Sequence, residues 1–390
     1  ERYDAVIGNP PYVRYQSFAG NARTKGLEAA LRQGVRLSGV TNAWAAFVVH
    51  ASQFLKPDGR LGLVLPAELL AVKYAAEVRR FLLRRFAKVR LVMFEELVFP
   101  GVLEDVLLLL AEGTGPAPHF EVHQARDLAA LTSASSTTWL GYTPERDGKW
   151  TTALLPKGAV EKFHSVIAGD GFSPLLKWGE STLGAVTGGN AFFAMTREDA
   201  AFHRIPEREL HRISPPGSRH LRGLSFSDAA WEEQAREGAA CFLFMPDAEK
   251  PSSAARRYIE HGEAQQVHTG YKCRMRKPWW RVPVVRIPDL LLTYMDHERP
   301  RLVANDAKVL HLNSLYGVNL RHGLKELGRE VLPLATLNTV SLLSAEMMGR
   351  SYGGGLLKFE PTEADGWAVP SEGALRATAD ELRALRPQLA

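Results

Sequence analysis

A segment of Asn, Pro, Pro and Tyr at residues 9–12 follows an apolar run at residues 5–7 near the start of the chain. The run is typical of a strand buried on both faces of a parallel sheet, and Gly8 ends it. Neither proline has a backbone N–H group, and Pro11 favours an extended conformation of Pro10. Asn9 and Tyr12 are therefore expected on a stiff turn. Ligands bind at the carboxyl ends of strands in an open α/β sheet, which makes this segment a candidate site.

The residue types of this segment suit an amino group attached to a flat ring. Such an amino group is a poor nucleophile, and hydrogen bonds from its hydrogens to an amide oxygen and a backbone carbonyl favour attack by its lone pair. An aromatic ring such as Tyr12 can stack on the flat group. The alternative is that Asn9 merely caps a turn stiffened by proline, and an isolated Asn-Pro-Pro sequence leaves both interpretations open.

Residues 4–12 resemble motif IV of the amino-methylating S-adenosylmethionine-dependent methyltransferases, in which Asn-Pro-Pro-Tyr follows the fourth strand of the sheet. The resemblance implies that the Asn9 side chain and the Pro10 carbonyl accept hydrogen bonds from the target amino group. It also implies that Tyr12 stacks on the substrate and that Asn9 lies at the edge of the cofactor site. No nucleophile or metal is required, because the methylsulfonium of the cofactor is already activated. The tetrapeptide also occurs in enzymes that methylate RNA or protein, so it does not fix the substrate.

Hydrophobic periodicity predicts the elements that position this segment. Residues 13–40 are interpreted as a polar, mobile segment, and strands are predicted at residues 60–66, 89–94 and 106–111. A helix from Asn42 is expected to have one apolar face, formed by Trp44, Phe47, Val48, Ala51 and Leu55. A second helix, around residues 78–86, carries four arginines that are interpreted as a solvated face: Arg79, Arg80, Arg84 and Arg85. This order of elements matches the second half of the family's sheet, including its closing hairpin.

Phe99 lies in the loop between the last two of these strands. The resemblance to adenine methyltransferases implies that it stacks opposite Tyr12, on the other side of a flipped base. The alternative is that Phe99 packs into the core beneath Pro100.

The composition changes near residue 176 to short apolar patches, many turns and aromatic residues beside basic ones. Stretches at residues 183–193, 271–283 and 352–361 resemble the target-recognition domain of TaqI-like, gamma-class adenine methyltransferases of restriction–modification systems. The expected fold class is α/β: the second half of a Rossmann-like methyltransferase sheet, followed by a mixed α+β target-recognition domain. The expected boundaries are 1–112 for the catalytic half, 113–175 for a bridging segment and 176–390 for the recognition domain with a terminal helix at 371–386.

Residues 269–286 contain six basic residues and no acidic one. Cations bind phosphates, arginine can recognise a guanine edge, and flat side chains can stack or wedge. The residues expected to contact double-stranded DNA are Lys272, Arg274, Arg276, Lys277, Trp279, Trp280, Arg281 and, from the stretch at 183–193, Asn190. The alternative for the tryptophans is a core role; in a strand, one would face inward and the other outward.

Composition argues against several other classes of protein. The 390 residues are 45% apolar with a net charge of +5, as in ordinary globular chains. No apolar run approaches the length of a membrane span and the start resembles no signal peptide, so a cytoplasmic protein is expected. Cys241 and Cys273 form no CxxC pattern and the twelve histidines form no HExxH pattern, so no metal site is expected.

No GxGxxG turn for S-adenosylmethionine occurs in the sequence, so the chain is interpreted as the later part of a larger protein or one half of a split enzyme. Residues 247–250 have the wrong spacing for a nuclease and are interpreted as a surface turn. The favoured function is methylation of the exocyclic amino group of a flipped adenine in duplex DNA. Its rivals are a methyltransferase acting on RNA or protein, and a non-catalytic DNA-binding or specificity subunit.

Overall fold

The computed structural model describes residues 1–390 except 97, 100–104, 134–137, 145–147, 284, 353–355 and 390. The described residues form two compact units, one of residues 1–162 with 350–356 and one of residues 163–349 with 357–390. The boundaries predicted from composition, at 112 and 175, differ from this division because the strands at 120–125 and 140–142 extend the sheet of the first unit.

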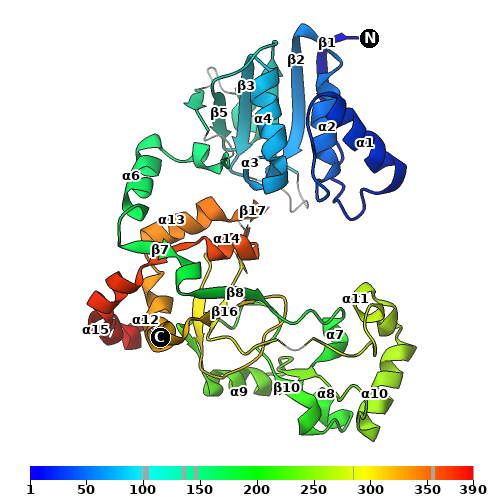
Figure 1. Ribbon diagram of the computed structural model, residues 1–390, viewed down its shortest axis with the longest axis vertical. Coiled ribbons are helices and arrows are strands. Elements are labelled where there is room, and N and C mark those ends of the chain that lie inside the picture. Colours follow the sequence, from blue (N-terminus) through cyan, green and yellow to red (C-terminus); the bar gives the residue numbers. More distant parts are fainter. Residues whose placement is uncertain are drawn as a thin grey trace. The chain divides into compact units, whose positions relative to one another are not determined.

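The first unit is built on a six-stranded mixed sheet (Figure 1). In spatial order its strands are β1 (Tyr3–Gly8), β2 (Leu55–Pro66), β4 (Val106–Glu112), β3 (Lys88–Phe94), β5 (Phe120–Ala125) and β6 (Leu140–Tyr142). β1 and β2 run parallel, while β4 lies antiparallel between β2 and β3. The strands predicted at 60–66, 89–94 and 106–111, and their closing hairpin, are therefore confirmed.

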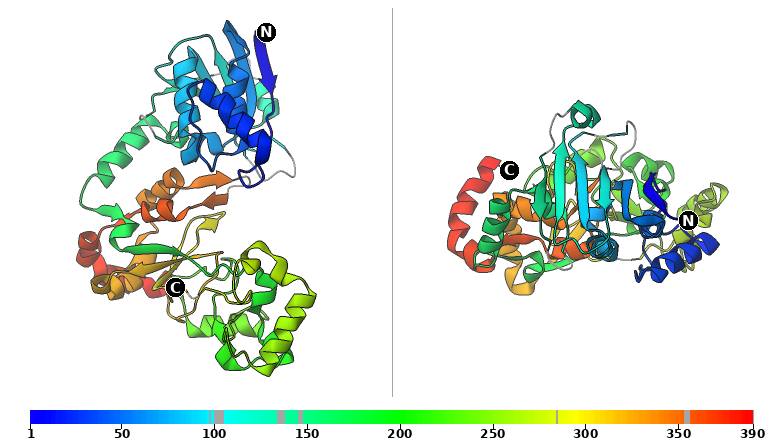
Figure 2. Two further views of the ribbon diagram at one scale, coloured as in Figure 1. Left: turned by 45° about the vertical axis from the view of Figure 1, so that its right-hand side comes forward. Right: turned by 90° about the horizontal axis from the view of Figure 1, so that it is seen from above.

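Helices cover this sheet, as the views of the first unit in Figures 1 and 2 show. The covering helices are α2 (Ala43–Ser52), α3 (Glu68–Ala71) and α4 (Ala76–Arg85), and α1 (Gly20–Arg32) packs against α2. Trp44 and Val48 of α2 are buried as predicted, whereas Phe47 is 45% exposed. The prediction of a mobile segment at residues 13–40 is wrong for residues 20–32, which form α1; the five Ala and Leu residues of this helix are too few to give a clear periodic signal.

β1 is also more exposed than predicted. Five of its six residues are exposed, and the Ile7 side chain is 85% exposed. The reason is its position: among the described strands it pairs with β2 alone, so it forms an edge of the sheet instead of a buried strand.

Arg79 is not part of a solvated face on α4. Its side chain is buried, and Nη1 donates to the carbonyl oxygens of Leu69, at 2.8 Å, and Val72, at 3.1 Å. Arg80, by contrast, is a surface residue that pairs with Glu77. The arginines of one helix therefore serve two different purposes, which their spacing alone did not reveal.

We expect Arg79→Ala to lower the free energy of unfolding by about 1.5–3 kcal/mol, because two carbonyl groups at the end of α3 lose a charged donor. Arg80→Ala, the matched surface control, should change it by no more than about 0.5 kcal/mol. Urea unfolding of both variants tests this expectation. Equal losses of stability would contradict the structural role of Arg79.

The second unit contains a five-stranded sheet and a smaller three-stranded sheet. The larger sheet has the order β11 (Ser225–Phe226), β15 (Leu302–Asn305), β13 (Leu290–Leu292), β16 (Tyr316–Leu320) and β8 (Gly179–Leu183). The smaller sheet has the order β10 (Leu210–Arg212), β12 (Phe242–Phe244) and β9 (Ala194–Met195). The helices of this unit with the most bearing on the site are α7 (Asn190–Phe193), α10 (Ser253–Ala264) and α11 (Tyr271–Arg274).

Three further helices contribute residues to the core of the larger sheet: α12 (Lys325–Ala335), α13 (Thr339–Met348) and α15 (Glu372–Leu389). α15 confirms the predicted terminal helix; its Leu375 is buried and its Leu385 is 46% exposed. Across the described residues, no single helix has both the length and the apolarity to cross a membrane; residues 322–335 and 339–348 pass only as a pair, bent by 89°.

The predicted surface turn at residues 247–250 is confirmed. The Asp247 carboxylate accepts hydrogen bonds from the backbone N–H groups of Lys250, at 2.7 Å, and Glu249, at 2.8 Å. These bonds lower the pKa of Asp247. The carboxylate therefore stabilises its own turn.

Candidate functional site

The segment at residues 9–12 leaves the carboxyl end of β1, beside the carboxyl end of the parallel strand β2. Asn9 is exposed and Pro10 is buried. Within the described part of the chain, the Asn9 side chain forms no hydrogen bond, so its amide does not cap the turn and can receive a ligand. This edge of the sheet is where open α/β folds bind ligands.

A hydrogen bond of its hydroxyl group holds Tyr12 in place. The hydroxyl donates to the carbonyl oxygen of Val64 in β2 at 3.1 Å, and the half-buried ring packs against the core of the first unit. Phe99 is 38% exposed, which disagrees with the alternative that it packs into the core; Pro100 lies outside the described residues. Both rings therefore keep accessible surface, and the pairing predicted for them stays a prediction.

The chain is fixed again directly after Tyr12, at the start of α2. The Val13 carbonyl accepts a hydrogen bond from the Ala43 N–H group at 2.9 Å. The Tyr15 N–H group donates to Oδ1 of Asn42, also at 2.9 Å. Asn42 was not identified as a site residue from the sequence, where it marked only the start of a helix.

In the second unit, the structure brings together two of the stretches identified from the sequence, residues 183–193 and 271–283. Arg276 Nη1 donates to the carbonyl of Thr187 at 2.7 Å, and Nη2 donates to that of Val186. Gly188 has a φ of +84°, and a Cβ atom there would lie 2.7 Å from Cβ of Lys272. Only glycine suits this approach.

The guanidinium of Arg276 is thus engaged inside the protein, which sets it apart from the neighbouring cations. Lys272, Arg274, Lys277 and Arg281 are all exposed, and the described residues give none of them an ion pair. Lys272 Nζ and the Arg274 guanidinium lie 5.8 and 5.7 Å from the centroid of the exposed Tyr271 ring. We call Lys272, Arg274, Lys277 and Arg281 the basic surface; its charges can neutralise phosphates.

Trp279 and Trp280 do not lie on a strand with one ring inward and one outward. They follow α11 in an irregular segment, and both are half buried against the core that includes Phe192 and Phe193. Trp279 Nε1 donates to Oε1 of Glu263 at 3.0 Å. The alternation that a strand would give does not arise, because residues 271–281 form a helix and a turn. Both rings act as anchors for the basic surface.

Asn190, the predicted DNA contact from the earlier stretch, is the first residue of α7 and is half buried. Its side-chain oxygen accepts a hydrogen bond from the Thr187 hydroxyl, within the loop that Arg276 contacts. The third stretch, 352–361, includes β18 (Leu356–Lys358), and its residues 353–355 lie outside the described residues.

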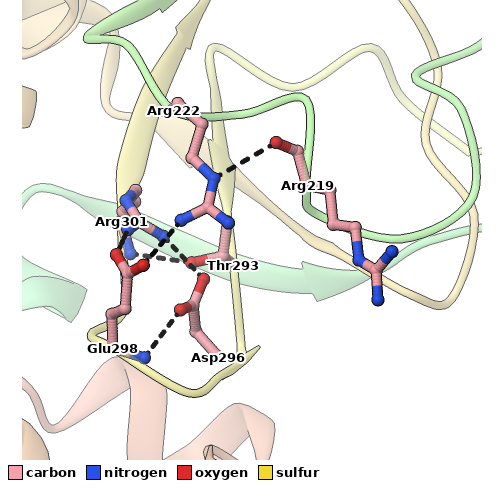
Figure 3. A network of polar contacts seen from close by, with 6 residues as sticks. All are labelled: Arg219, Arg222, Thr293, Asp296, Glu298 and Arg301. Atoms are coloured by element: carbon pink, nitrogen blue, oxygen red, sulfur yellow. Dashed lines mark hydrogen bonds and ion pairs between the residues drawn. The ribbon is translucent and has the colours of Figure 1, made fainter.

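A further cation cluster was missed from the sequence and is shown in Figure 3. Arg301 is buried and pairs with Asp296 at 2.7 Å and with Glu298. Arg222 Nη1 pairs with Glu298 at 3.0 Å, and this contact lowers the pKa of that carboxyl group. The loop that carries Arg222 is thereby held against residues 293–301.

The exposed Arg219 lies beside this network, but its guanidinium takes no part in it. Arg222 Nε donates to the carbonyl oxygen of Arg219 at 3.3 Å, while the Arg219 guanidinium points away from the cluster (Figure 3). The described residues give that guanidinium no hydrogen bond or ion pair. The sequence did contain an indication of this cation cluster, because residues 210–227 include three arginines and no acidic residue. Among the described residues, no group of three or more His, Cys, Asp or Glu side chains could hold a metal ion.

Two family models match the chain. Residues 1–99 match the Eco57I restriction-modification methylase, and residues 147–388 match the C-terminal domain of the Type II methyltransferase M.Eco57I. The chain is 22% identical to the Type II methyltransferase M.AccI of Acinetobacter calcoaceticus, covering 98% of this chain and 72% of the relative. It is 24% identical to M.XamI of Xanthomonas campestris pv. amaranthicola, covering 94% of this chain and 67% of the relative.

The fold is similar to that of a solved restriction–modification enzyme. The Type IIL enzyme MmeI, determined in complex with DNA, matches 91% of this chain with a TM-score of 0.54 and 13% sequence identity. The chain spans 45% of the length of that enzyme. The predicted α/β fold class, with a methyltransferase sheet followed by a mixed α+β part, is thereby confirmed.

Proposed function

Because the chain belongs to the family of the Type II methyltransferase M.Eco57I, we propose that it methylates the exocyclic amino group of adenine in duplex DNA. The methyl donor is S-adenosylmethionine, and the target base is flipped out of the helix. Such a reaction needs access to the DNA of a cell, so the proposal implies a cytoplasmic protein of a restriction–modification system.

The observation that carries this proposal is the geometry of residues 9–12. The exposed amide of Asn9 lies at the carboxyl end of β1 without a partner among the described residues, while Tyr12 is anchored to Val64. Asn9 Oδ1 and the Pro10 carbonyl are proposed to accept the two hydrogens of the adenine amino group. Accepting both hydrogens directs the nitrogen lone pair toward the methyl group. Tyr12 and Phe99 are proposed to stack on the flipped base.

The second unit supports duplex DNA as the substrate. The basic surface presents four exposed cations without ion pairs among the described residues, next to anchored tryptophans and the loop of Asn190. Positive charge of this kind binds the phosphate backbone. We propose the first unit as the catalytic half and the second unit as the target-recognition domain, in place of the boundaries expected at residues 112 and 175. The relatives M.AccI and M.XamI are named Type II methyltransferases, which favours DNA over the RNA and protein alternatives.

The described residues fit only the edge of a site for S-adenosylmethionine. The side chain of Asn9 is available at the carboxyl end of β1, but no GxGxxG turn occurs in the chain to approach the cofactor closely. The cofactor, when bound, supplies an activated methyl group. The residues of this chain bind and orient the amino group that receives it.

We therefore expect residues 1–390 alone to bind S-adenosylmethionine weakly or not at all, because one exposed amide cannot replace the backbone contacts of a glycine-rich turn. Calorimetric titration of this chain tests the expectation, with S-adenosylhomocysteine as a second ligand. Micromolar binding would contradict it and would reveal a cofactor site among these residues.

The proposed function itself is tested with the complete gene product. Duplex DNA, single-stranded RNA and a protein extract are offered with radiolabelled S-adenosylmethionine, and the modified base is identified by mass spectrometry. Label found as N6-methyladenine in duplex DNA supports the proposal. Label in RNA or protein favours the first rival. Specific DNA binding without label favours a non-catalytic specificity subunit.

A further inference from the structure

Asn42 occupies the N-cap position of α2 but does not cap that helix. An N-cap asparagine ordinarily accepts a hydrogen bond from the backbone at the second or third helical residue. Here Oδ1 accepts from the Tyr15 N–H group at 2.9 Å, and Nδ2 donates to Oε2 of Glu68 at 3.0 Å. The amide is 8% exposed, so a polar group is buried to join two segments outside its own helix.

Glu68 fixes which way the Asn42 amide faces. It is the first residue of α3, two residues after the end of β2, and an ionised carboxylate can only accept hydrogen bonds. The Asn42 NH₂ group must therefore face Glu68, which directs its oxygen toward Tyr15. Tyr74 donates to the same Glu68 oxygen at 2.7 Å and accepts from Trp44 Nε1 at 3.1 Å. Burial and the neighbouring carboxylate raise the pKa of Tyr74, so its phenol remains a donor.

We infer that Asn42, oriented by Glu68 and Tyr74, is a positioning residue for the Asn9–Tyr12 segment. This inference rests on the proposed function. The Asn9 side chain has no hydrogen bond within the described part of the chain, so its placement depends on how the following residues are fixed. Among the hydrogen bonds that fix them, one joins Tyr12 to Val64, one joins Val13 to Ala43 and one joins Tyr15 to Asn42. The Asn42 bond is the one of these that depends on the identity of the side chain accepting it.

The requirement for asparagine is chemical. The position needs an acceptor toward Tyr15 and a donor toward Glu68, on one short side chain. Aspartate keeps the acceptor but places a second carboxylate against Glu68, and like charges repel at this distance. Exchanging the two partners restores the bond between positions 42 and 68, because Nε2 of a glutamine at 68 carries two hydrogens, one for the carboxylate of an aspartate at 42 and one for a lone pair of the Tyr74 hydroxyl.

The test compares Asn42→Asp, Asn42→Asp with Glu68→Gln, and Tyr74→Phe in the complete gene product. For Asn42→Asp we expect kcat on duplex DNA to fall roughly tenfold, less than the 100-fold that a misplacement of 1 Å can cost, with KM for DNA unchanged. The double variant should recover much of the loss. Tyr74→Phe, which removes one donor and keeps the ring, should give a smaller loss. Amide hydrogen exchange at residues 12–15 should become faster in Asn42→Asp and return toward the original rate in the double variant.

Asn338→Ala is the matched control, because Asn338 caps α13 in the ordinary way by accepting from Ser341 N–H. It should lower the melting temperature and leave kcat unchanged. An unchanged kcat in Asn42→Asp, no recovery in the double variant, or an equal loss of kcat in Asn338→Ala would overturn the inference. If Asn42→Asp does not fold, the same readouts in Tyr74→Phe decide it. A wild-type protein that methylates no duplex would instead refute the proposed function, and hydrogen exchange would still test the contact between Asn42 and Tyr15.

Discussion

Replacing Asn9 by alanine should lower the turnover of the complete enzyme by about 100-fold or more, as removal of one preorganised polar group does elsewhere. The Asn9 side chain is exposed at the carboxyl end of β1 and forms no hydrogen bond among the described residues, so its removal takes away a substrate contact and no internal one. Stability and duplex affinity should therefore change little. Single-turnover methylation, duplex binding and thermal unfolding measure the three quantities.

The matched control for this variant is Asn21→Ala, which removes an exposed asparagine from α1 in the same unit. It should leave turnover unchanged. Full turnover in Asn9→Ala would remove Asn9 from the mechanism and leave the segment as a turn. A loss of stability large enough to explain the loss of turnover would have the same consequence.

Replacing all four cations of the basic surface by glutamine should weaken duplex binding by on the order of 100-fold or more at low salt, since each neutralised phosphate adds to a steep dependence on salt. Each phosphate that the variant no longer neutralises should lower the slope of log K against log salt by about 0.9. An arginine that reads a base should behave differently: its replacement should cost about 1–3 kcal/mol on the cognate site and much less on random DNA. Affinity across a salt series, on cognate and scrambled duplexes, separates the two cases.

A pairwise comparison supplies the control. Lys272→Gln with Arg274→Gln removes two cations from the basic surface, and Arg80→Gln with Arg84→Gln removes two from α4 in the other unit. The first pair should weaken binding and lower the salt slope, and the second should do neither. Equal losses of affinity would mean that general positive charge explains the binding. Arg276→Gln should act through stability, because its guanidinium holds the carbonyls of Val186 and Thr187.

Local patterns predicted the centre of the first unit well. β2, β3, β4, α2 and α4 follow from apolar periodicity, because each pattern is complete within about ten residues. Pairings between distant segments could not be predicted in the same way. The joining of β5 and β6 to the first sheet depends on register, and the exposure of β1 depends on how many strands neighbour it. Arg79 was wrongly predicted to face solvent, because its partners, Leu69 and Val72, lie in and directly after α3 and not on its own helix.

The residues of the candidate site likewise differ in whether a local pattern or a distant contact identifies them. Asn9, Pro10 and Tyr12 lie within four consecutive residues, so their order in the sequence was enough to propose them. Asn42 and Glu68 are 26 residues apart, and their contact exists because α2 begins beside the end of β2. In the second unit, the count of cations identified the basic surface, but it did not distinguish the inward guanidinium of Arg276 from the exposed ones. That distinction requires the loop at 186–188, which is far away in the sequence.

The contact between Gly188 and Lys272 also limits how this protein can be re-engineered. A graft of residues 271–281 from a relative that lacks arginine at 276 would remove the guanidinium that holds the carbonyls of Val186 and Thr187. A graft of residues 183–193 that brings any residue but glycine to 188 would place a Cβ atom at a left-handed position, 2.7 Å from Cβ of Lys272. The two segments are therefore one exchangeable cassette, and a chimera has to carry both.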